Sequence, residues 1–400
     1  MTTVKSSLYR LSNRTELPAP EPGLFRSELE RTPASLRLPV GNEHLFIDGA
    51  ADGAADRAGV ALETSPALTA RSFSSPRHTT RYWEAGPSDG SLMIFVHGWT
   101  EIGLIWRAQV EALASEGWHC VAPDMRGYGG SSVQTVGEAY ALKEVVDDMV
   151  ELHDHLGARP AIWVGHDLGS PVAGALAAHH PKRCRGVVFA SVPYSPEGFA
   201  LPSLLPLIDR KLYPADQYPD GQWSYYRFYL THFEQTVTDF NADIPATLAS
   251  IYRRGDPASV GKVYRSALVA SHGGWFGSAH RAPATPPDPA LWPPGDFDVL
   301  TEAFRSTGFR PCNSWYLNDA ANIAYAQAAP DGGRLRQPVL FVNGEFDGIC
   351  DITRSRLGDP MRRTCKDLSV TNLPAGHWLP LERKTELVQA ILSWLKTRGL

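Results

Sequence analysis

The sequence predicts an α/β protein in which a mainly parallel β-sheet is covered by helices on both faces and interrupted by a helical insertion. Short apolar runs such as AIWVG (residues 161–165) predict buried strands. They alternate with amphipathic segments such as AYALKEVVDDMVELHDHLG (139–157), which ends at glycine as many helices do. Strands that alternate with helices favour a parallel sheet with both faces buried. The alternation stops near Pro196 and resumes with PVLFVNGEFD (338–347).

Each predicted element has its own signal in the sequence. The predicted strands are the apolar runs SLMIFVHG (91–98), HCVAPD (119–124), AIWVG (161–165), GVVFASVP (186–193) and PVLFVNGEFD (338–347). The predicted helices are IWRAQVEALASEG (105–117), AYALKEVVDDMVELHDHLG (139–157), SPVAGALAAHHP (170–181) and KTELVQAILSWLKTRG (384–399). The insertion adds helical stretches such as WSYYRFYLTHFEQTVTDF (223–240) and the Pro-rich loop RAPATPPDPALWPPGD (281–296).

Four segments follow from this pattern. Residues 1–74 form an N-terminal extension of uncertain structure, in which DGAADGAADRAG (48–59) predicts a flexible loop. Residues 75–196 form the first part of the α/β core, and residues 331–400 form its second part. Residues 197–330 form a helical insertion, which we expect to act as a lid over a site.

The composition excludes several classes of protein. A hydrophobic share of 43% and a charged share of 20% are typical of a soluble globular protein. The net charge of -5, with no basic block, disfavours a nucleic-acid partner. No secretory signal and no apolar run of membrane-spanning length is visible, so we expect a cytoplasmic protein without membrane attachment. The sequence is compatible with a homo-oligomer as well as with a monomer.

Nothing in the sequence predicts a metal or a cofactor. The five cysteines are odd in number and scattered without a C-x-x-C spacing, which favours reduced thiols and no zinc site. The Gly-rich DMRGYGGSS (124–132) lacks the lysine and the spacing of a phosphate-binding loop. We expect this segment to hold the loop after its strand through a pair between Asp124 and Arg126.

The stretch VGHDLGS (164–170) joins a predicted strand to a predicted helix and has the G-x-nucleophile-x-G pattern of a nucleophile elbow, with Asp167 in the middle. The flanking glycines let neighbouring backbone pass close to a tight turn. The following helix start favours the ionised carboxylate, because its dipole is positive there. A helix cap is the alternative role for Asp167.

Two further residues complete a catalytic triad in chain order. Asp347 follows the late strand in NGEFDG, and His377 lies in LPAGHWLP before the last helix. Nucleophile, acid and histidine occur in the order of the α/β-hydrolase triad. Asp351 is the alternative acid. The VHGWT segment predicts an oxyanion hole from the backbone N–H groups of Trp99 and Leu168.

An aspartate in this position selects a class of reaction. The carboxylate is ionised at neutral pH and can displace a leaving group from a saturated carbon, which gives an ester with the enzyme. His377, oriented by Asp347, then activates water to hydrolyse that ester. The substrate is therefore an epoxide or carries a carbon–halogen bond. A halide needs N–H donors, and Leu168 offers no side-chain donor, whereas tyrosines of the insertion suit an epoxide oxygen.

Over residues 75–400 the chain resembles the α/β-hydrolase-fold epoxide hydrolases of the soluble type. The resemblance rests on HGWT, RGYGGSS, GHDLGS, YYRFYL, NSWYLN, GEFD and AGHW, in family order. The family pairs a tyrosine of a Y-x-x-Y segment with one of a W-Y-x-N segment. The resemblance therefore implies that Tyr226 and Tyr316 donate protons to the epoxide oxygen, with Tyr225 and Tyr229 close by. His97 and His166 are expected to be structural members of their turns.

Two departures from the family pattern keep other functions open. Thr100 replaces the usual proline of His-Gly-x-Pro, and Leu168 replaces the usual tryptophan after the nucleophile. The first expectation is an epoxide hydrolase that makes vicinal diols. The alternatives are a hydrolytic haloalkane dehalogenase and a ligand-binding homologue without turnover. Aromatic residues of the insertion suggest an apolar or aromatic small-molecule epoxide, namely Trp223, Tyr225, Phe228, Trp275 and Phe276.

Overall fold

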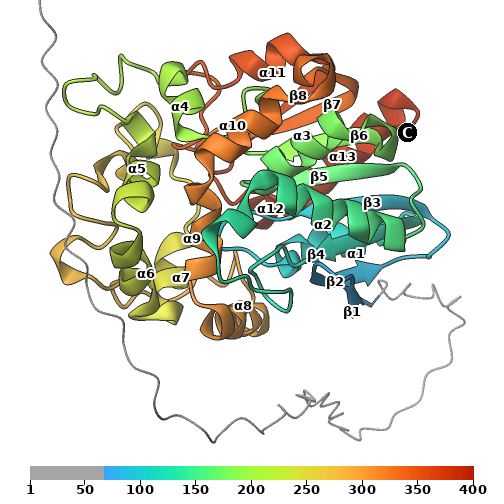
Figure 1. Cartoon of the computed structure of the whole chain (residues 1–400), viewed down its shortest axis with the longest axis horizontal. Helices are drawn as coiled ribbons and strands as arrows, with labels where there is room; N and C mark the ends of the chain where they lie inside the picture. Colours follow the sequence, from blue (N-terminus) through green and yellow to red (C-terminus); the bar gives the residue numbers. More distant parts are fainter. Residues whose placement is uncertain (1–66) are drawn as a thin grey trace, which may run out of the picture. The chain divides into compact units, whose positions relative to one another are not determined.

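Eight strands form one sheet in the order β1-β2-β4-β3-β5-β6-β7-β8 in the computed structural model, which describes residues 67–400 (Figure 1). The strands are β1 (Thr69–Ser74), β2 (Thr79–Ala85), β3 (Ser91–Val96), β4 (Trp118–Pro123), β5 (Ala161–His166), β6 (Cys184–Ala190), β7 (Leu335–Gly344) and β8 (Cys365–Leu373). β2 pairs antiparallel with β1 and with β4, and all other neighbours are parallel.

The centre of the sheet is buried on both faces. Every residue of β5 is buried, and in β3 and β6 only one residue each is not. Continuous apolar runs are expected where helices cover both faces of a parallel sheet. The five predicted strands correspond to β3, β4, β5, β6 and β7, so the predicted mainly parallel sheet is confirmed.

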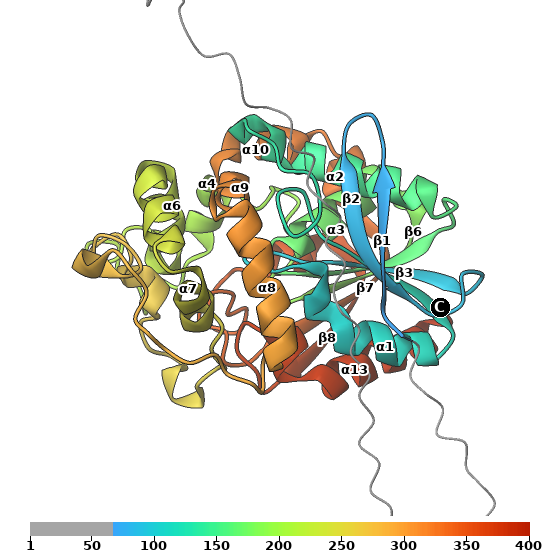
Figure 2. The same cartoon turned by 90° about the horizontal axis from the view of Figure 1, so that it is seen from below.

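Helices lie on both faces of this sheet. α1 and α13 contact each other on one face, and α2 contacts α3 on the other, as Figure 2 shows. The helices are α1 (Arg107–Ser115), α2 (Leu142–His155), α3 (Gly169–His179), α4 (Leu201–Leu204), α5 (Ser224–Thr231), α6 (Phe233–Asn241), α7 (Ile244–Ile251), α8 (Pro294–Thr307), α9 (Arg310–Ser314), α10 (Asp319–Gln327), α11 (Asp359–Thr364), α12 (Leu379–Glu382) and α13 (Lys384–Arg398). Within residues 67–400, none of them combines the length and apolar character that crossing a membrane requires.

The edges of the sheet differ from the sequence expectation. β1 lies inside the segment 1–74, for which no structure was predicted, and β2 and β8 were not predicted as strands. The sequences of β1, β2 and β8 contain no long apolar run, because many of their side chains are polar and half-buried or exposed. The predicted flexible loop at residues 48–59 lies outside the described residues.

The connection from β6 to β7 carries helices α4 to α10, all within residues 197–330. We refer to residues 197–330 as the insertion. The predicted helical stretch 223–240 is two helices, because the backbone breaks at His232 between α5 and α6. Large aromatic side chains fill the interior of the insertion, among them Trp223, Tyr226, Tyr229 and Phe240, each at most 1% exposed.

Candidate active site

Asp167 lies in the sharp turn between β5 and α3, with a left-handed backbone (φ 47°) that side-chain-bearing residues rarely adopt. A Cβ on Gly165 would lie 2.5 Å from the carbonyl oxygen of Gly169, and one on Gly169 would overlap the carbonyl oxygen of Val96. Only glycine fits at these two positions. The turn therefore pushes the Asp167 carboxylate out at the carboxyl end of the sheet.

The structure brings Asp167, His377 and Asp347 together. His377 Nε2 lies 3.3 Å from Asp167 Oδ2, and His377 Nδ1 lies 2.9 Å from Asp347 Oδ2. Asp347 follows β7, and His377 lies in the loop between β8 and α12. The backbone N–H groups of Ile349 and Cys350 donate to Asp347 Oδ1 at 2.9 and 3.1 Å, which fixes this carboxylate. The three side chains have the geometry of nucleophile, base and orienting acid.

Asp351, the alternative acid, is directed elsewhere. Its Oδ2 pairs with Arg354 at 2.8 Å, and its Oδ1 accepts two backbone N–H groups of the same loop. His377 therefore takes its carboxylate partner from Asp347. Cys350 also lies here, and together with Asp347 and His377 it gives three side chains of metal-binding type in a small volume.

Each charged group of the triad shifts the pKa of its neighbours toward their charged forms. Burial disfavours a charged imidazole, but the carboxylates of Asp347 and Asp167 outweigh it and raise the pKa of His377 well above its usual value. Burial also opposes the charge on Asp167 and Asp347, and His377 outweighs it there and lowers the pKa of both. Each of the three groups therefore favours the charged form of its neighbour.

Trp99 and Leu168, the residues predicted to form an oxyanion hole, lie close to the Asp167 carboxylate. The Trp99 N–H donates to Asp167 Oδ1 at 2.6 Å. A Cβ on Gly98 would lie 2.5 Å both from Asp167 Oδ1 and from the Leu168 backbone nitrogen. Glycine at position 98 thus lets the Trp99 loop approach the start of α3. The Trp99 indole N–H is already committed, because it donates to Asn313 Oδ1 at 2.9 Å.

Thr100 stands where the family pattern has proline, and it is packed into the protein interior. It has a left-handed backbone (φ 62°) and is fully buried. Its carbonyl oxygen accepts a hydrogen bond from the Tyr252 hydroxyl at 2.6 Å. A tyrosine of the insertion therefore holds the loop that carries Trp99.

The structure brings Tyr316 to the site but not Tyr226. The Tyr226 hydroxyl donates to Asp319 at the start of α10, away from the nucleophile. Its neighbour Tyr225 on α5 lines a cavity with Asp167, and so does Tyr316, which lies in the short helix Trp315–Leu317. The Tyr316 ring lies 6.0 Å from the Tyr225 ring and 4.8 Å from the Tyr226 ring, so the cavity lining and the bond from Tyr226 to Asp319, and not the ring distances, distinguish the two neighbours. Of the tyrosines in the two motif segments, Tyr225 and Tyr316 thus line the cavity of Asp167, which Tyr264 also lines.

Both phenols keep their protons. Burial raises the pKa of Tyr225 and that of Tyr316 well above the usual value, and the negative charge of Asp167 acts in the same direction. They can therefore donate hydrogen bonds to an oxygen placed above the carboxylate.

The cavity above Asp167 has a volume of about 50 Å³. It is lined by Trp99, Asp167, Tyr225, Ile251, Tyr264, Arg265, Trp275, Tyr316, Ile349, His377 and Trp378. Of the five aromatic residues expected to shape it, Tyr225 and Trp275 line it. Trp223 and Phe228 are buried inside the insertion, and Phe276 lines a neighbouring cavity of about 210 Å³.

Sequence analysis missed Glu101, which is fully buried below the nucleophile. Its Oε2 accepts the Gly98 N–H at 2.6 Å, and its Oε1 lies 2.5 Å from His166 Nδ1. His166 Nε2 lies 2.7 Å from the carbonyl oxygen of His377, so this nitrogen carries a proton and donates it. A buried carboxylate thus connects the elbow to the loop of the base. The sequence contains a signal for this role, because an acidic residue directly follows the HGWT motif.

His97 has a structural role, as predicted for its turn. Its Nε2 accepts the Met125 N–H at 2.8 Å, so its Nδ1 carries the proton and donates to the Gly98 carbonyl oxygen at 3.0 Å. Its pKa is lowered by burial, in spite of nearby carboxylates. His97 therefore stays neutral and holds two loops together.

The predicted pair between Asp124 and Arg126 is wrong. Asp124 pairs with Arg81 of β2 at 2.9 Å, and Arg126 pairs with Asp148 of α2 at 2.6 Å. Neighbouring strands and helices supply these partners, which sequence proximity does not reveal. Asp124 still organises the loop, because its carboxylate also accepts the Gly103 and Gly130 N–H groups.

Comparisons with known proteins agree with this geometry. Residues 91–384 match the family described as alpha/beta hydrolase fold. Epoxide hydrolase A of Mycobacterium tuberculosis is 31% identical over 79% of this chain and 93% of its own length, and epoxide hydrolase B of the same organism is 32% identical over 76% and 91%. The crystal structure of epoxide hydrolase A from Mycobacterium thermoresistibile superimposes with a TM-score of 0.68 at 26% identity and covers 82% of this chain and 98% of that one.

The matched region contains the whole sheet from β3 onward, the insertion and the Asp167–His377–Asp347 triad. The predicted α/β-hydrolase fold is confirmed. The chain belongs to the alpha/beta hydrolase fold family, and within it to the epoxide hydrolases.

Proposed function

We propose that this enzyme opens an epoxide by forming an alkyl ester on Asp167 and then hydrolyses that ester to a vicinal diol. One observation carries the proposal. A carboxylate occupies the nucleophile elbow, between an oxyanion-hole N–H and a histidine base, and two phenols lie across the cavity from it. The named relatives are epoxide hydrolases, which agrees with this reaction.

The first step forms the ester. Asp167 Oδ1 is held by the Trp99 N–H at 2.6 Å, so Oδ2, which has only the longer 3.3 Å contact with His377 Nε2, attacks a ring carbon of the epoxide. The carbon–oxygen bond of the ring breaks, and the ring oxygen takes a proton from Tyr225 or Tyr316. Oδ1 becomes the ester carbonyl oxygen, already seated in the oxyanion hole.

The second step releases the diol. Alkylation makes Asp167 neutral and removes one of the two carboxylates that raise the pKa of His377, so this pKa falls. The imidazolium gives up its proton, which replaces the one lost by the phenol. Neutral His377 then takes a proton from water, and the hydroxide attacks the Asp167 carbonyl carbon. Cleavage of the ester restores the carboxylate and the imidazolium.

The substrate class follows from the cavity wall. Most of its lining side chains are aromatic or aliphatic, and they favour a small apolar or aromatic epoxide. A halide would need N–H donors directed at it. Leu168 has no side-chain donor and the Trp99 indole is bonded to Asn313, so an epoxide suits this site better than a haloalkane.

Two assays in parallel test the proposed function. The purified chain is incubated with styrene oxide and with 1-chlorohexane, and diol and chloride are measured. We expect diol with little chloride. Chloride release with a kcat/KM equal to that for the epoxide would identify a dehalogenase instead. Binding of both compounds without any product would identify a ligand-binding homologue.

Phenylalanine substitutions distinguish Tyr225 and Tyr316, which line the cavity, from Tyr226, which does not. Tyr225→Phe and Tyr316→Phe should each slow ester formation by about 10- to 1000-fold, the usual value of a positioned acid. The double variant should lose less than the product of the two, because both phenols act on one oxygen. Ester formation is measured by rapid-quench mass spectrometry under single-turnover conditions.

Tyr226→Phe is the matched control, since Tyr226 is adjacent on α5 but bonds Asp319. It should change the rate of ester formation by less than about fivefold, or about 1 kcal/mol. A larger loss with Tyr226→Phe than with Tyr225→Phe would restore the assignment that the sequence motif suggests.

The pH dependence of the two steps should differ. Ester hydrolysis needs neutral His377, so its rate should rise with pH through the pKa that His377 has in the alkyl-enzyme. This midpoint should lie below the pKa of His377 in the resting enzyme, which has one more carboxylate beside the ring. Single-turnover ester decay and the ring resonances of labelled histidine give the two values. Equal midpoints would show that alkylation leaves the charge around His377 unchanged.

A further inference from the structure

Three different metal-binding groups meet beside the nucleophile. Asp347, Cys350 and His377 each offer one ligand atom, and these atoms all lie within 4.8 Å of one another. The short loop after β7 creates this proximity, because the Cys350 N–H folds back onto Asp347 Oδ1. Cys350 is 1% exposed, and no step of the proposed reaction uses its thiol.

We propose that Asp347, Cys350 and His377 bind a thiophilic divalent metal ion such as Zn²⁺, and that this ion inhibits the enzyme. Thiolate, imidazole and carboxylate are the ligands that Zn²⁺ prefers in proteins, whereas Mg²⁺ and Ca²⁺ prefer oxygen alone. Three protein ligands with a water in the fourth position are a common arrangement. When the ion binds, the Cys350 thiol and the protonated His377 ring each release one proton to solvent, because only a thiolate and a neutral imidazole can ligate a metal.

The spacing is compatible with such a site. Zinc bonds of 2.0–2.3 Å in a tetrahedron place neighbouring ligand atoms about 3.5 Å apart. The observed limit of 4.8 Å therefore means that the ligand atoms would approach one another by at most about 1.3 Å when the ion binds. The hydrogen bond between Asp347 and His377, at 2.9 Å, already holds two of the three ligands in place.

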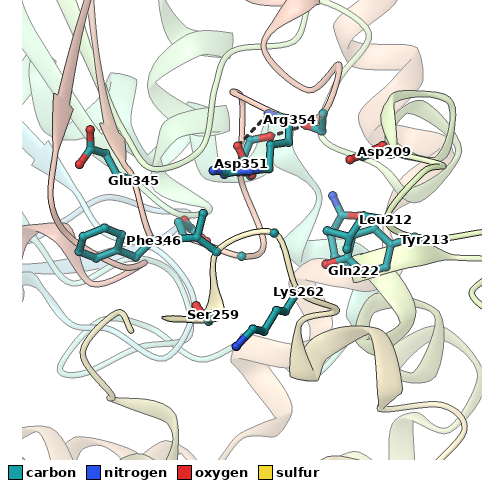
Figure 3. Close-up of a pocket in the computed structure, with 15 residues that line it drawn as sticks. Asp209, Leu212, Tyr213, Gln222, Ser259, Lys262, Glu345, Phe346, Asp351 and Arg354 are labelled. Carbon is teal, nitrogen blue, oxygen red and sulfur yellow. Dashed lines mark hydrogen bonds and ion pairs between the residues drawn. The ribbon is translucent and has the colours of Figure 1, made fainter. Parts of the chain in front are cut away.

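Asp347 also lines a second pocket, which we take as the way the ion reaches the site (Figure 3). Its lining includes four carboxylates and two cationic side chains, namely Asp209, Glu345, Asp347, Asp351, Lys262 and Arg354. Figure 3 shows Arg354 joined to Asp351, with Lys262 apart from that pair. The excess of negative charge attracts a cation, and Asp347 is common to this pocket and to the metal-binding group.

The ion would inhibit the enzyme whether it binds Nδ1 or Nε2 of His377. At His377 Nδ1 the ion would replace the hydrogen bond that orients the ring on Asp347. At Nε2 it would occupy the nitrogen that faces Asp167 and must accept the proton of water. The inhibition rests on the proposed function of His377, but the binding of the ion does not.

Cobalt absorption tests the binding without any turnover. Co²⁺ is added to the full chain, and the near-ultraviolet charge-transfer band between thiolate and cobalt is recorded. We expect one equivalent of Co²⁺ to give the band, Zn²⁺ to abolish it, and Mg²⁺ to have no effect. Cys350→Ser and Cys350→Ala should lose the band. Cys184→Ser should keep it, because Cys184 begins β6 at the opposite end of the sheet. No band in the unmodified chain, or an equal band in both Cys350 variants, would overturn the site.

Enzyme assays test the inhibition. Each variant is compared with its own metal-free rate, and chelation should restore the activity. The Zn²⁺ concentration for half-inhibition should rise at least about tenfold in Cys350→Ser, since even residues that only support metal ligands contribute roughly 10- to 100-fold to affinity. Equal Zn²⁺ sensitivity of Cys350→Ser and Cys184→Ser would refute the inhibitory role. A chain that shows the cobalt band but no diol formation would keep the metal site and refute the proposed function.

Discussion

Asp167→Ala should abolish diol formation, with a loss in kcat of roughly 10⁴- to 10⁶-fold, as for removal of other enzymatic nucleophiles. The substitution removes the atom that bonds to the substrate, and no other carboxylate faces the ring carbon, since Asp347 is held behind His377. The measurement is diol formation under saturating epoxide. Asp351→Ala is the matched control and should keep most of the activity, because Asp351 pairs with Arg354 in the loop.

Oxygen labelling identifies the attacking atom directly. One turnover of the unmodified enzyme in water enriched in oxygen-18 should place the heavy oxygen in the Asp167 carboxylate, while the first diol receives an unlabelled oxygen from the enzyme. Heavy oxygen in the diol of that first turnover would mean that water attacks the epoxide without a covalent intermediate.

His377→Gln should trap the alkyl-enzyme. Asp167 needs no base to attack, so the first step proceeds, but water is no longer activated and hydrolysis slows by about 10⁴-fold or more. Intact-mass spectrometry after mixing with epoxide should show one added substrate mass that persists. Peptide mapping should locate it on Asp167.

A matched pair of variants checks the orienting acid in the same experiment. Asp347→Asn should also accumulate the adduct, because His377 loses the carboxylate at 2.9 Å that holds its ring. Asp351→Asn should hydrolyse the adduct as fast as the unmodified enzyme. An inactive His377→Gln variant without adduct would show that His377 is needed before the ester forms.

That Asp167, His377 and Asp347 meet could be predicted from the sequence because these residues lie at the ends of recognisable elements. Asp167 falls between a buried strand and a helix, and Asp347 follows another apolar run. Which tyrosine of α5 lines the cavity was harder to predict. Tyr225 and Tyr226 are neighbours on one helix, and their side chains differ in direction by about 100°. A motif does not fix which of the two directions faces Asp167, and the bond from Tyr226 to Asp319 depends on packing between α5 and α10.

Other features depend on partners that are distant in the chain. Arg126 and Asp148 are 22 residues apart and meet only because α2 packs beside the loop after β4. Most side chains of the edge strands β1 and β8 are exposed or half-buried, so neither strand has the apolar run that predicts a buried strand. Each is a strand because it pairs with a neighbour, β1 with β2 and β8 with β7.

The carbonyl oxygen of His377 accepts hydrogen bonds from His166 and from the Ser191 hydroxyl at 2.9 Å. His166 is covalently joined to the nucleophile, and Ser191 directly follows β6. The gap between nucleophile and base is therefore set by groups of the sheet and its adjoining turns. The cavity lining, in contrast, comes largely from the insertion. Different segments thus control the two properties: substitutions in the insertion can reshape the cavity without moving the groups that hold the nucleophile and the base at their distance.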